Sequence, residues 1–267
     1  MIAGHAALLF AVTSLVSGCP APGYDPDWRS KTQRVLVLPL NVVAEMPEEL
    51  AGGARRVDEI LLDYLAERGK SVSTIGFKDA AAAWHAGESD CRSAATKGCE
   101  RFDRAAPFAA RHLRADHDYD LLIVPYLLLR GARTNGYTAS FDGVERLVKM
   151  PRYAPYGPYG YGPYAYGPSY AWGGPYAWGG WGGGWGGWGG SRIRAASLKV
   201  FGFFPDGKRS FAGIGGLDVV DRIEVSEESG AYTFEVRENV LGDPAAIREG
   251  VARALSRLVP RPEPSRS

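Results

Sequence analysis

The forty residues from 151 to 190 constrain the fold of this chain more than any other segment. They contain fifteen Gly, eight Tyr, six Pro and five Trp, with a single charge at Arg152. Gly and Pro oppose regular helices and strands, and the aromatic rings lack the aliphatic partners that pack a core. Because strand-like segments flank this tract on both sides, the sequence predicts a disordered loop inserted within one folded domain.

The first nineteen residues have the pattern of a lipoprotein signal peptide. An apolar run at residues 6–15 precedes Val16-Ser17-Gly18-Cys19. Small residues fit a peptidase cleft, and the Cys19 thiol can carry a diacylglyceryl group such as one bearing palmitate. A plain membrane anchor is one alternative, but the run is shorter than the ~20 residues that a spanning helix needs; a soluble N-terminus with a chance cysteine is the other. We expect a signal peptide at residues 1–18, lipidation at Cys19 and a Pro-rich tether at residues 19–33.

Folding signals begin directly after this tether. The apolar, β-branched run at residues 34–40 predicts a strand buried on both faces. Apolar residues at helical spacing then end at Gly69, where a left-handed residue suits a helix C-terminus. Residues 71–77 predict a second strand. Strand, helix and strand in this order favour a right-handed βαβ unit.

The remaining segments predict further helices and strands. Short helices are expected at residues 78–85, bounded by Gly87, and at residues 104–113, with Pro107 in the first turn. The other expected elements are a central strand at 119–129, short strands at 137–141 and 144–150, a hairpin of 196–204 with 210–220, and an amphipathic helix at 245–258. We expect one α/β or α+β domain with a mixed sheet and flanking helices, built from residues 34–150 and 191–259, with a disordered tail at 260–267.

Charge and cysteine content limit the partners and the compartment. Thirty-one Lys and Arg against thirty Asp and Glu give a net charge of +1, which provides no large field to attract nucleic acid. Cys91 and Cys99 lie in a polar segment expected to be a loop, residues 89–99. In an oxidising periplasm we expect them to form a disulfide. A zinc site would need two more ligands, and none is adjacent in the sequence.

Motifs for catalysis or cofactor binding are weak. Gly213-Ile214-Gly215-Gly216 has the composition of a phosphate loop, but no helix follows it. No Gly-x-Ser-x-Gly elbow is present either. We therefore expect no enzyme activity and no cofactor.

One cluster contains several residue types that bind metals. His112 and His117 are five residues apart and do not share a helix face, so a solvated helix-to-strand turn explains the cluster better than a metal site. A metal-dependent hydrolase around these two histidines is a third functional alternative. The cluster consists of His112, Asp116, His117, Asp118 and Asp120.

The aromatic residues of the insert offer a different kind of interaction. Exposed Trp and Tyr rings can stack on sugars, lie among lipid headgroups or associate with one another. A passive loop without a ligand is the alternative. The candidate residues are Tyr153, Tyr156, Tyr159, Tyr161, Tyr164, Tyr166, Tyr170, Trp172, Tyr176, Trp178, Trp181, Trp185 and Trp188.

The order of elements after the tether resembles that of known bacterial envelope lipoproteins. The motifs are Val35-Leu36-Val37-Leu38-Pro39 before a helix and Leu65-Ala66-Glu67-Arg68-Gly69 before a strand. Over residues 34–130 the chain resembles the small α/β domain of the curli secretion lipoprotein and of the lipoprotein activators of penicillin-binding proteins. This resemblance implies a non-catalytic periplasmic adaptor or assembly component tethered to the outer membrane.

We therefore expect a lipid-anchored envelope protein that faces the periplasm and binds another envelope protein. The alternative is a glycan-binding or surface-adhesive lipoprotein that binds peptidoglycan or polysaccharide through the insert. The two alternatives share the anchor at Cys19 and differ in which part of the chain makes the contact.

The anchor is tested by replacing Cys19 with Ser. A thioether requires the thiol, so Cys19→Ser should leave an unprocessed precursor without lipid. Intact-mass spectrometry of membrane fractions measures both effects. Mature wild-type protein that carries no acyl group would contradict the expectation.

Overall fold

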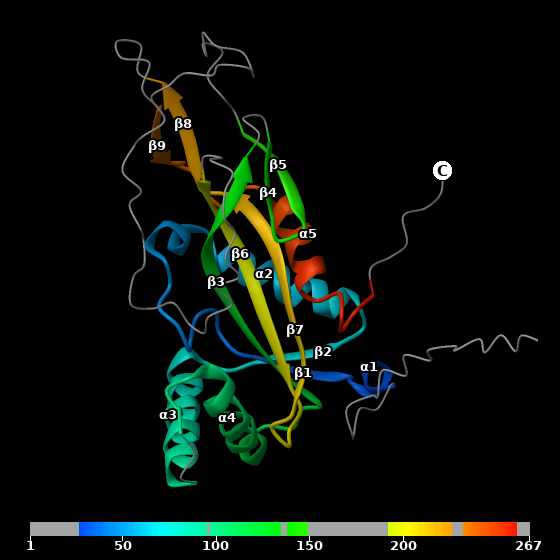
Figure 1. Ribbon diagram of the computed structural model, residues 1–267. Helices are drawn as coiled ribbons and strands as arrows, with labels where there is room; N and C mark the ends of the chain where they lie inside the picture. The colour runs from blue at the N-terminus through cyan, green and yellow to red at the C-terminus, as the bar shows by residue number, and fades with distance from the viewer. Residues whose placement is uncertain (1–26, 95–96, 135–137, 149–191, 226–231, 261–267) are drawn as a thin grey trace, which may run out of the picture.

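The computed structural model describes residues 27–94, 97–134, 138–148, 192–225 and 232–260 (Figure 1). These residues form an α/β fold with a mixed sheet and flanking helices, which confirms the predicted fold class. Within this described part of the chain, no helix is long and apolar enough to span a membrane. The helices are α1 (Trp28–Lys31), α2 (Glu48–Glu67), α3 (Phe77–Ser93), α4 (Phe102–Asp116) and α5 (Pro244–Ala254). The strands are β1 (Arg34–Val37), β2 (Ser71–Thr74), β3 (Leu121–Thr134), β4 (Thr138–Phe141), β5 (Val144–Leu147), β6 (Arg192–Phe203), β7 (Arg209–Val219), β8 (Asp221–Val225) and β9 (Tyr232–Val236).

The main sheet is organised around the long strand β3. It runs parallel to β1 on one edge and antiparallel to β6 on the other, where the pairing extends from Leu122 opposite Phe203 to Arg133 opposite Arg192. β2 is parallel to β1, so β1, α2 and β2 form the predicted βαβ unit. β7 pairs with β6 as the predicted hairpin, while β8 and β9 form a small second sheet that the sequence analysis missed.

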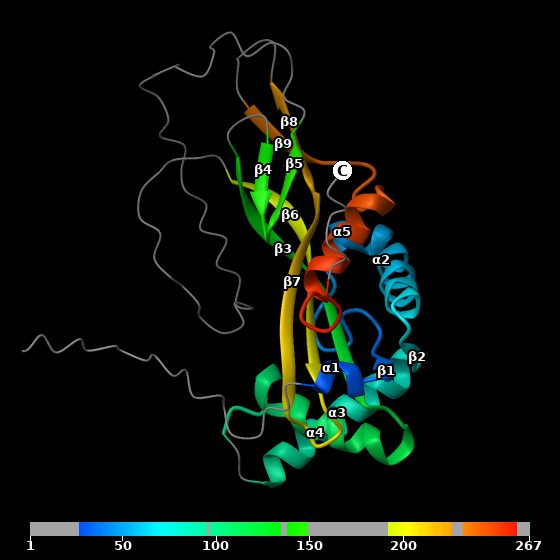
Figure 2. The same cartoon turned by 90° about the vertical axis from the view of Figure 1, so that its right-hand side faces the viewer.

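Helices cover both faces of this sheet, α3 and α4 at its lower end on one face, and α2 and α5 higher up on the other (Figures 1 and 2). On one face α2 and α5 pack with Val35, Leu121 and Leu198, and Figure 2 shows these two helices side by side. On the other face α3 and α4 pack with Leu36, Leu122 and other residues of β1, β3 and β6. Successive strand residues point to opposite faces, so an unbroken apolar run such as that in β3 can supply both cores.

The side chain of Asn41 substitutes for a strand beside β3. Beyond β1 the chain turns at Asn41, which has φ +57°, a left-handed value that Asn tolerates better than most residues. Its Oδ1 accepts a hydrogen bond from the Leu127 N–H at 2.8 Å, and its Nδ2 donates to the Leu127 carbonyl at 3.0 Å. The amide thereby satisfies buried backbone groups between the regions paired with β1 and β4.

The β4–β5 hairpin folds over the upper part of the sheet and encloses a third core. Its turn, Asp142-Gly143, has positive φ at both residues, as two-residue hairpin turns of this kind require. The Gly216 N–H of β7 donates to the Asp142 carbonyl, and the Phe141 and Val144 side chains lie against Gly216. Ala132, Ile193, Val219 and others form the apolar cluster beneath the hairpin.

Glycines of β7 allow α5 to lie directly on the strand. A Cβ at Gly213 would lie 1.9 Å from the Ala254 carbonyl oxygen, and one at Gly215 would lie 2.0 Å from that of Gly250. The glycine run of β7 is therefore the place where this strand contacts α5. Its role is close backbone approach, and its resemblance to a phosphate loop is only one of composition.

Three local expectations from the sequence need correction. The helix expected to stop before Gly87 continues to Ser93, because Gly87 lies inside α3, where that helix crosses α4. Pro107 is in the second turn of α4 and not in the first, since this helix begins at Phe102. Part of the expected tether is folded, because Trp28 of α1 is buried against Phe204 and Phe211.

Gly87 and Gly52 allow a matched test of the helix crossing. A Cβ at Gly87 would lie 2.5 Å from the Ala109 backbone nitrogen, whereas nothing lies within 4 Å of one at Gly52 in α2. We expect Gly87→Ala to lower the free energy of unfolding by about 1–3 kcal/mol. Gly52→Ala should raise it by about 0.5–1 kcal/mol through helix propensity. Urea denaturation measures both, and equal effects would refute a close contact at Gly87.

Candidate interaction surface

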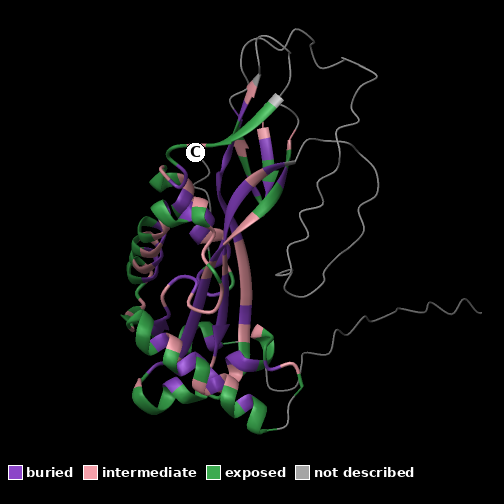
Figure 3. Cartoon of the chain, turned by 90° about the vertical axis from the view of Figure 1, so that its left-hand side faces the viewer, coloured by how far each residue is buried: buried purple, intermediate pink, exposed green. Residues whose placement is uncertain are grey.

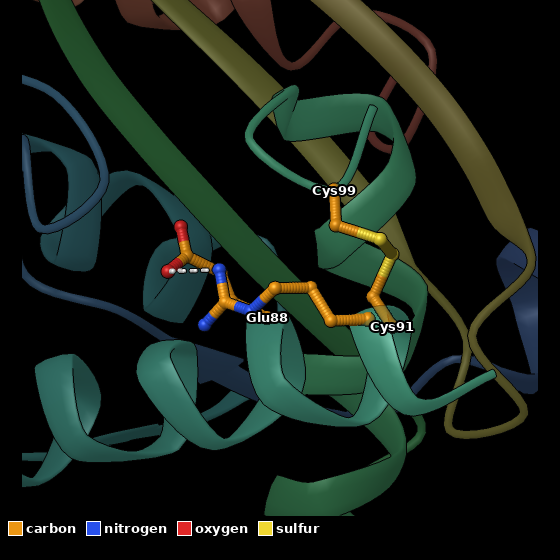
Figure 4. The surroundings of a disulfide bond; sticks show 4 residues. Glu88, Cys91 and Cys99 are labelled. Carbon is orange, nitrogen blue, oxygen red and sulfur yellow. Dashed lines mark ion pairs between the residues drawn. A yellow bond between two sulfur atoms is a disulfide. The ribbon is translucent and has the colours of Figure 1, made fainter. Parts of the chain in front are cut away.

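The predicted disulfide between Cys91 and Cys99 is present and joins the end of α3 to the segment before α4. The two Cα atoms are 5.8 Å apart, and both cysteines are buried (Figure 4). Cys91 lies in the last turn of α3, so it is helical and not in a loop as expected. Glu88 lies one turn earlier and accepts a hydrogen bond from the Trp84 indole at 3.0 Å. The disulfide therefore fastens together the two helices that cover one face of the sheet.

The His and Asp cluster forms ion pairs with arginines. Asp118 pairs with both Arg34 and Arg114, and Asp120 accepts hydrogen bonds from the Arg34 side chain. His112 and His117 lie near the end of α4 and are not joined to these acids. Among the residues that the structure describes, no three His, Cys, Asp or Glu side chains are grouped so that they could hold a metal ion.

Asp120 connects the beginnings of β1 and β3. Burial disfavours its charged form, but hydrogen bonds from the Arg34 side chain and from the backbone N–H groups of Arg34 and Gln33 outweigh this and lower its pKa to about 2. The carboxylate therefore remains ionised at neutral pH, and its role is structural.

Cys19 and all thirteen candidate aromatics of the insert lie outside the described residues. The described ends of the chain on either side of the insert are Val148, after β5, and Arg192, at the start of β6. β5 and the start of β6 both lie at the upper end of the sheet in Figure 1. The described elements on either side of the insert thus lie at the end of the sheet that is remote from α1.

Part of one sheet face lies between α3 and α4 below and the β4–β5 hairpin above. In Figure 3 the helices have one exposed side, while the strands between them are mostly buried. Several strand side chains that point to this face remain partly or fully exposed. We name these the open sheet face: Tyr126, Leu128, Arg130, Lys199 and Ile214.

Lys199 lies at the centre of the open sheet face. Its ammonium is 5.0 Å from the centre of the Phe201 ring and 5.8 Å from that of Tyr126, both within the range of cation–π attraction. Burial raises the pKa of Tyr126 to about 12, so its hydroxyl stays neutral. The face therefore combines positive charge with aromatic surface.

A cleft of about 790 Å³ adjoins this face at the β4–β5 hairpin. It is lined by arginines from three elements, of which Arg146 pairs with Glu249 at 2.7 Å and Arg253 pairs with the same carboxylate at 2.9 Å. The side-chain hydrogen bond from Arg146 is the main reason why the pKa of Glu249 is lowered. This arrangement fastens the hairpin to α5 and leaves a polar, charged opening beside Arg130.

Sequence reasoning did not single out Lys199, Arg146 or Glu249. The sequence of a strand such as β6 does not show whether a helix covers the face to which Lys199 points. The ion pair between Arg146 of β5 and Glu249 of α5 joins positions about a hundred residues apart, so no local pattern predicts it. No family model, curated protein or solved structure matches this chain. Function therefore has to be argued from its own residues.

The stability supplied by Asp120 should depend on pH. Its folded pKa is below the unfolded value of about 3.9, so the stabilisation is complete above pH ~4 and is lost as the pH falls toward 2. We expect Asp120→Asn to reduce the free energy of unfolding at pH 7 by about 1 kcal/mol. The more exposed Asp118→Asn is the control and should cost less. Urea denaturation at several pH values measures the free energy of unfolding of wild type and Asp120→Asn. A difference between the two that does not shrink in acid would contradict this role of Asp120.

Proposed function

We propose that this protein is a lipid-anchored bacterial envelope protein that acts in the periplasm as a non-catalytic interaction module. The observation that carries the proposal is the buried disulfide between Cys91 and Cys99. Structural disulfides persist in oxidising compartments such as the periplasm. This agrees with the lipoprotein signal that ends at Cys19 and with the resemblance of residues 34–130 to envelope adaptors.

The elongated shape of the domain favours an orientation in which one end lies near the membrane and the other points away from it. Asp27 is the eighth residue after Cys19, so an extended tether reaches at most about 29 Å. α1, where the described chain begins, lies near the lower end of the sheet in Figures 1 and 2, and the β4–β5 and β8–β9 hairpins lie at the upper end. The fourteen residues of β3 span about 46 Å. An anchor at Cys19 would keep the α1 end near the lipid and leave the hairpin end free for a partner. We place the anchored protein at the outer membrane, facing the periplasm.

The alternative is a glycan-binding or adhesive lipoprotein that uses the aromatic insert. The composition of residues 151–190 favours it, because uncharged tracts of Tyr and Trp offer many stacking faces. The metal-dependent hydrolase is not favoured by any contact of His112 or His117.

Replacing residues 151–190 with a short Gly/Ser linker separates the two functions. Longer surface loops cost little closure entropy, so the thermal transition should move by only a few degrees. An adaptor should still capture its protein partner after crosslinking of the acylated protein in cells. A glycan binder should lose retention on isolated peptidoglycan, and that loss combined with unchanged thermal stability would overturn the adaptor proposal.

The compartment is tested by the state of the two cysteines. Thiol labelling of denatured, unreduced protein from cells should find neither Cys91 nor Cys99 free. After reduction both should react, which serves as the positive control. Labelling of both cysteines without reduction would contradict the periplasmic proposal.

A further inference from the structure

The open sheet face carries a cation without a hydrogen-bonding partner. The described residues place no carboxylate, carbonyl or hydroxyl oxygen within hydrogen-bonding distance of the Lys199 ammonium, and its contacts there are the rings of Tyr126 and Phe201. A half-buried ammonium normally acquires acceptors, since burial without them is costly. Lys199 is therefore ready to receive an acceptor from outside the domain.

Two arginines add to the positive charge around Lys199. Burial lowers the pKa of Lys199, the charges of Arg130 and Arg209 lower it further, and Asp142 opposes them. Asp142 is already engaged, because it accepts a hydrogen bond from the Ser197 hydroxyl at 2.6 Å and lies 3.5 Å from Arg130 Nε. Three cations thus face one occupied carboxylate, which favours a negatively charged ligand.

Two of these cations lie on the open sheet face itself. Lys199 is on β6, and Arg130 of β3 is opposite Ala195, four residues from Lys199 along β6. Arg209 is opposite Phe203, which α3 and α4 cover. Four residues of strand correspond to about 13 Å. A single small anion can meet only one of the two charges on the face, whereas an extended peptide with several acidic side chains can meet both.

We propose that the open sheet face binds an extended acidic segment of a partner protein, with its carboxylates on Lys199 and Arg130. Apolar side chains of the segment would lie against Tyr126, Leu128 and Ile214. This inference deepens the proposed adaptor function and rests on it only for the statement that a protein partner exists. The acyl group at Cys19 has no part in this contact.

The probe is a fluorescein-labelled eight-residue peptide of alternating Glu and Thr, which places all carboxylates on one face when extended. A peptide with Gln in place of Glu is the charge control. Fluorescence anisotropy against the purified full chain in detergent should show binding of the Glu peptide only. The affinity should fall as salt rises, because the contacts are ionic and partly exposed.

Substitutions locate the site. The double variant Lys199→Gln with Arg130→Gln should weaken binding about tenfold, while Lys199→Arg should retain it because the charge remains. Arg55→Gln is the matched control, since Arg55 is exposed on α2, which packs on the opposite face of the sheet. Its affinity should stay within about twofold of wild type. Circular dichroism and thermal unfolding verify that each variant is folded.

Any of five outcomes would overturn the proposal. Equal binding of the Gln peptide would remove the role of charge, and an equal loss in Arg55→Gln would remove the role of this face. Displacement by inorganic phosphate at the same concentration as the peptide carboxylates would indicate a small-anion site. Binding that appears only after residues 151–190 are replaced would indicate that the insert occupies the face. If crosslinking captures a partner protein while the peptide does not bind, the adaptor function stands and this surface is wrong.

Discussion

The fold depends on the complete pairing of β3. One edge of this strand pairs with β6 along almost its whole length, and the other is divided among β1, the Asn41 side chain and β4. In the largely buried part of β3, residues 121–127, backbone groups cannot stay unpaired, because water does not reach them. The Asn41 amide pairs with Leu127 in the gap between β1 and the β4–β5 hairpin. Removing that amide would leave two buried backbone groups without partners.

Close backbone contacts set the second constraint. Gly87 at the crossing of α3 and α4, and Gly213 and Gly215 beneath α5, permit distances that a Cβ would forbid. These glycines bring α3 against α4 and α5 against β7. On the sheet face that carries α3 and α4, Tyr126 and Lys199 remain partly exposed between these helices and the β4–β5 hairpin. The proposed binding surface is thus a consequence of how the covering elements are packed.

Two parts of the chain support the proposed function: the predicted lipidation site at Cys19 and the open sheet face of the domain. The cysteine pair and the predicted lipoprotein signal both favour an oxidising envelope compartment, and the predicted tether would hold the α1 end close to lipid. The ion pairs around Asp120 lie near that end and stabilise the junction of β1 and β3. The open sheet face is different, because its central lysine has no oxygen partner within the described part of the domain. A lysine without an acceptor can bind a group from a partner protein, whereas the groups of the Asp120 ion pairs already bind one another.

Local patterns in the sequence were sufficient for most elements of the fold. Apolar runs, helical spacing and helix-end residues such as Gly69 predicted β1, α2, β3, the β6–β7 hairpin and α5, because those signals act over a few residues. The cysteine pair was also predictable, since two cysteines eight residues apart have few other partners. Tertiary structure alone decided that Gly87 is a helix contact, that Trp28 belongs to the core, and which sheet face stays open. Those features depend on groups brought together from distant positions, so no local pattern in the sequence contains them.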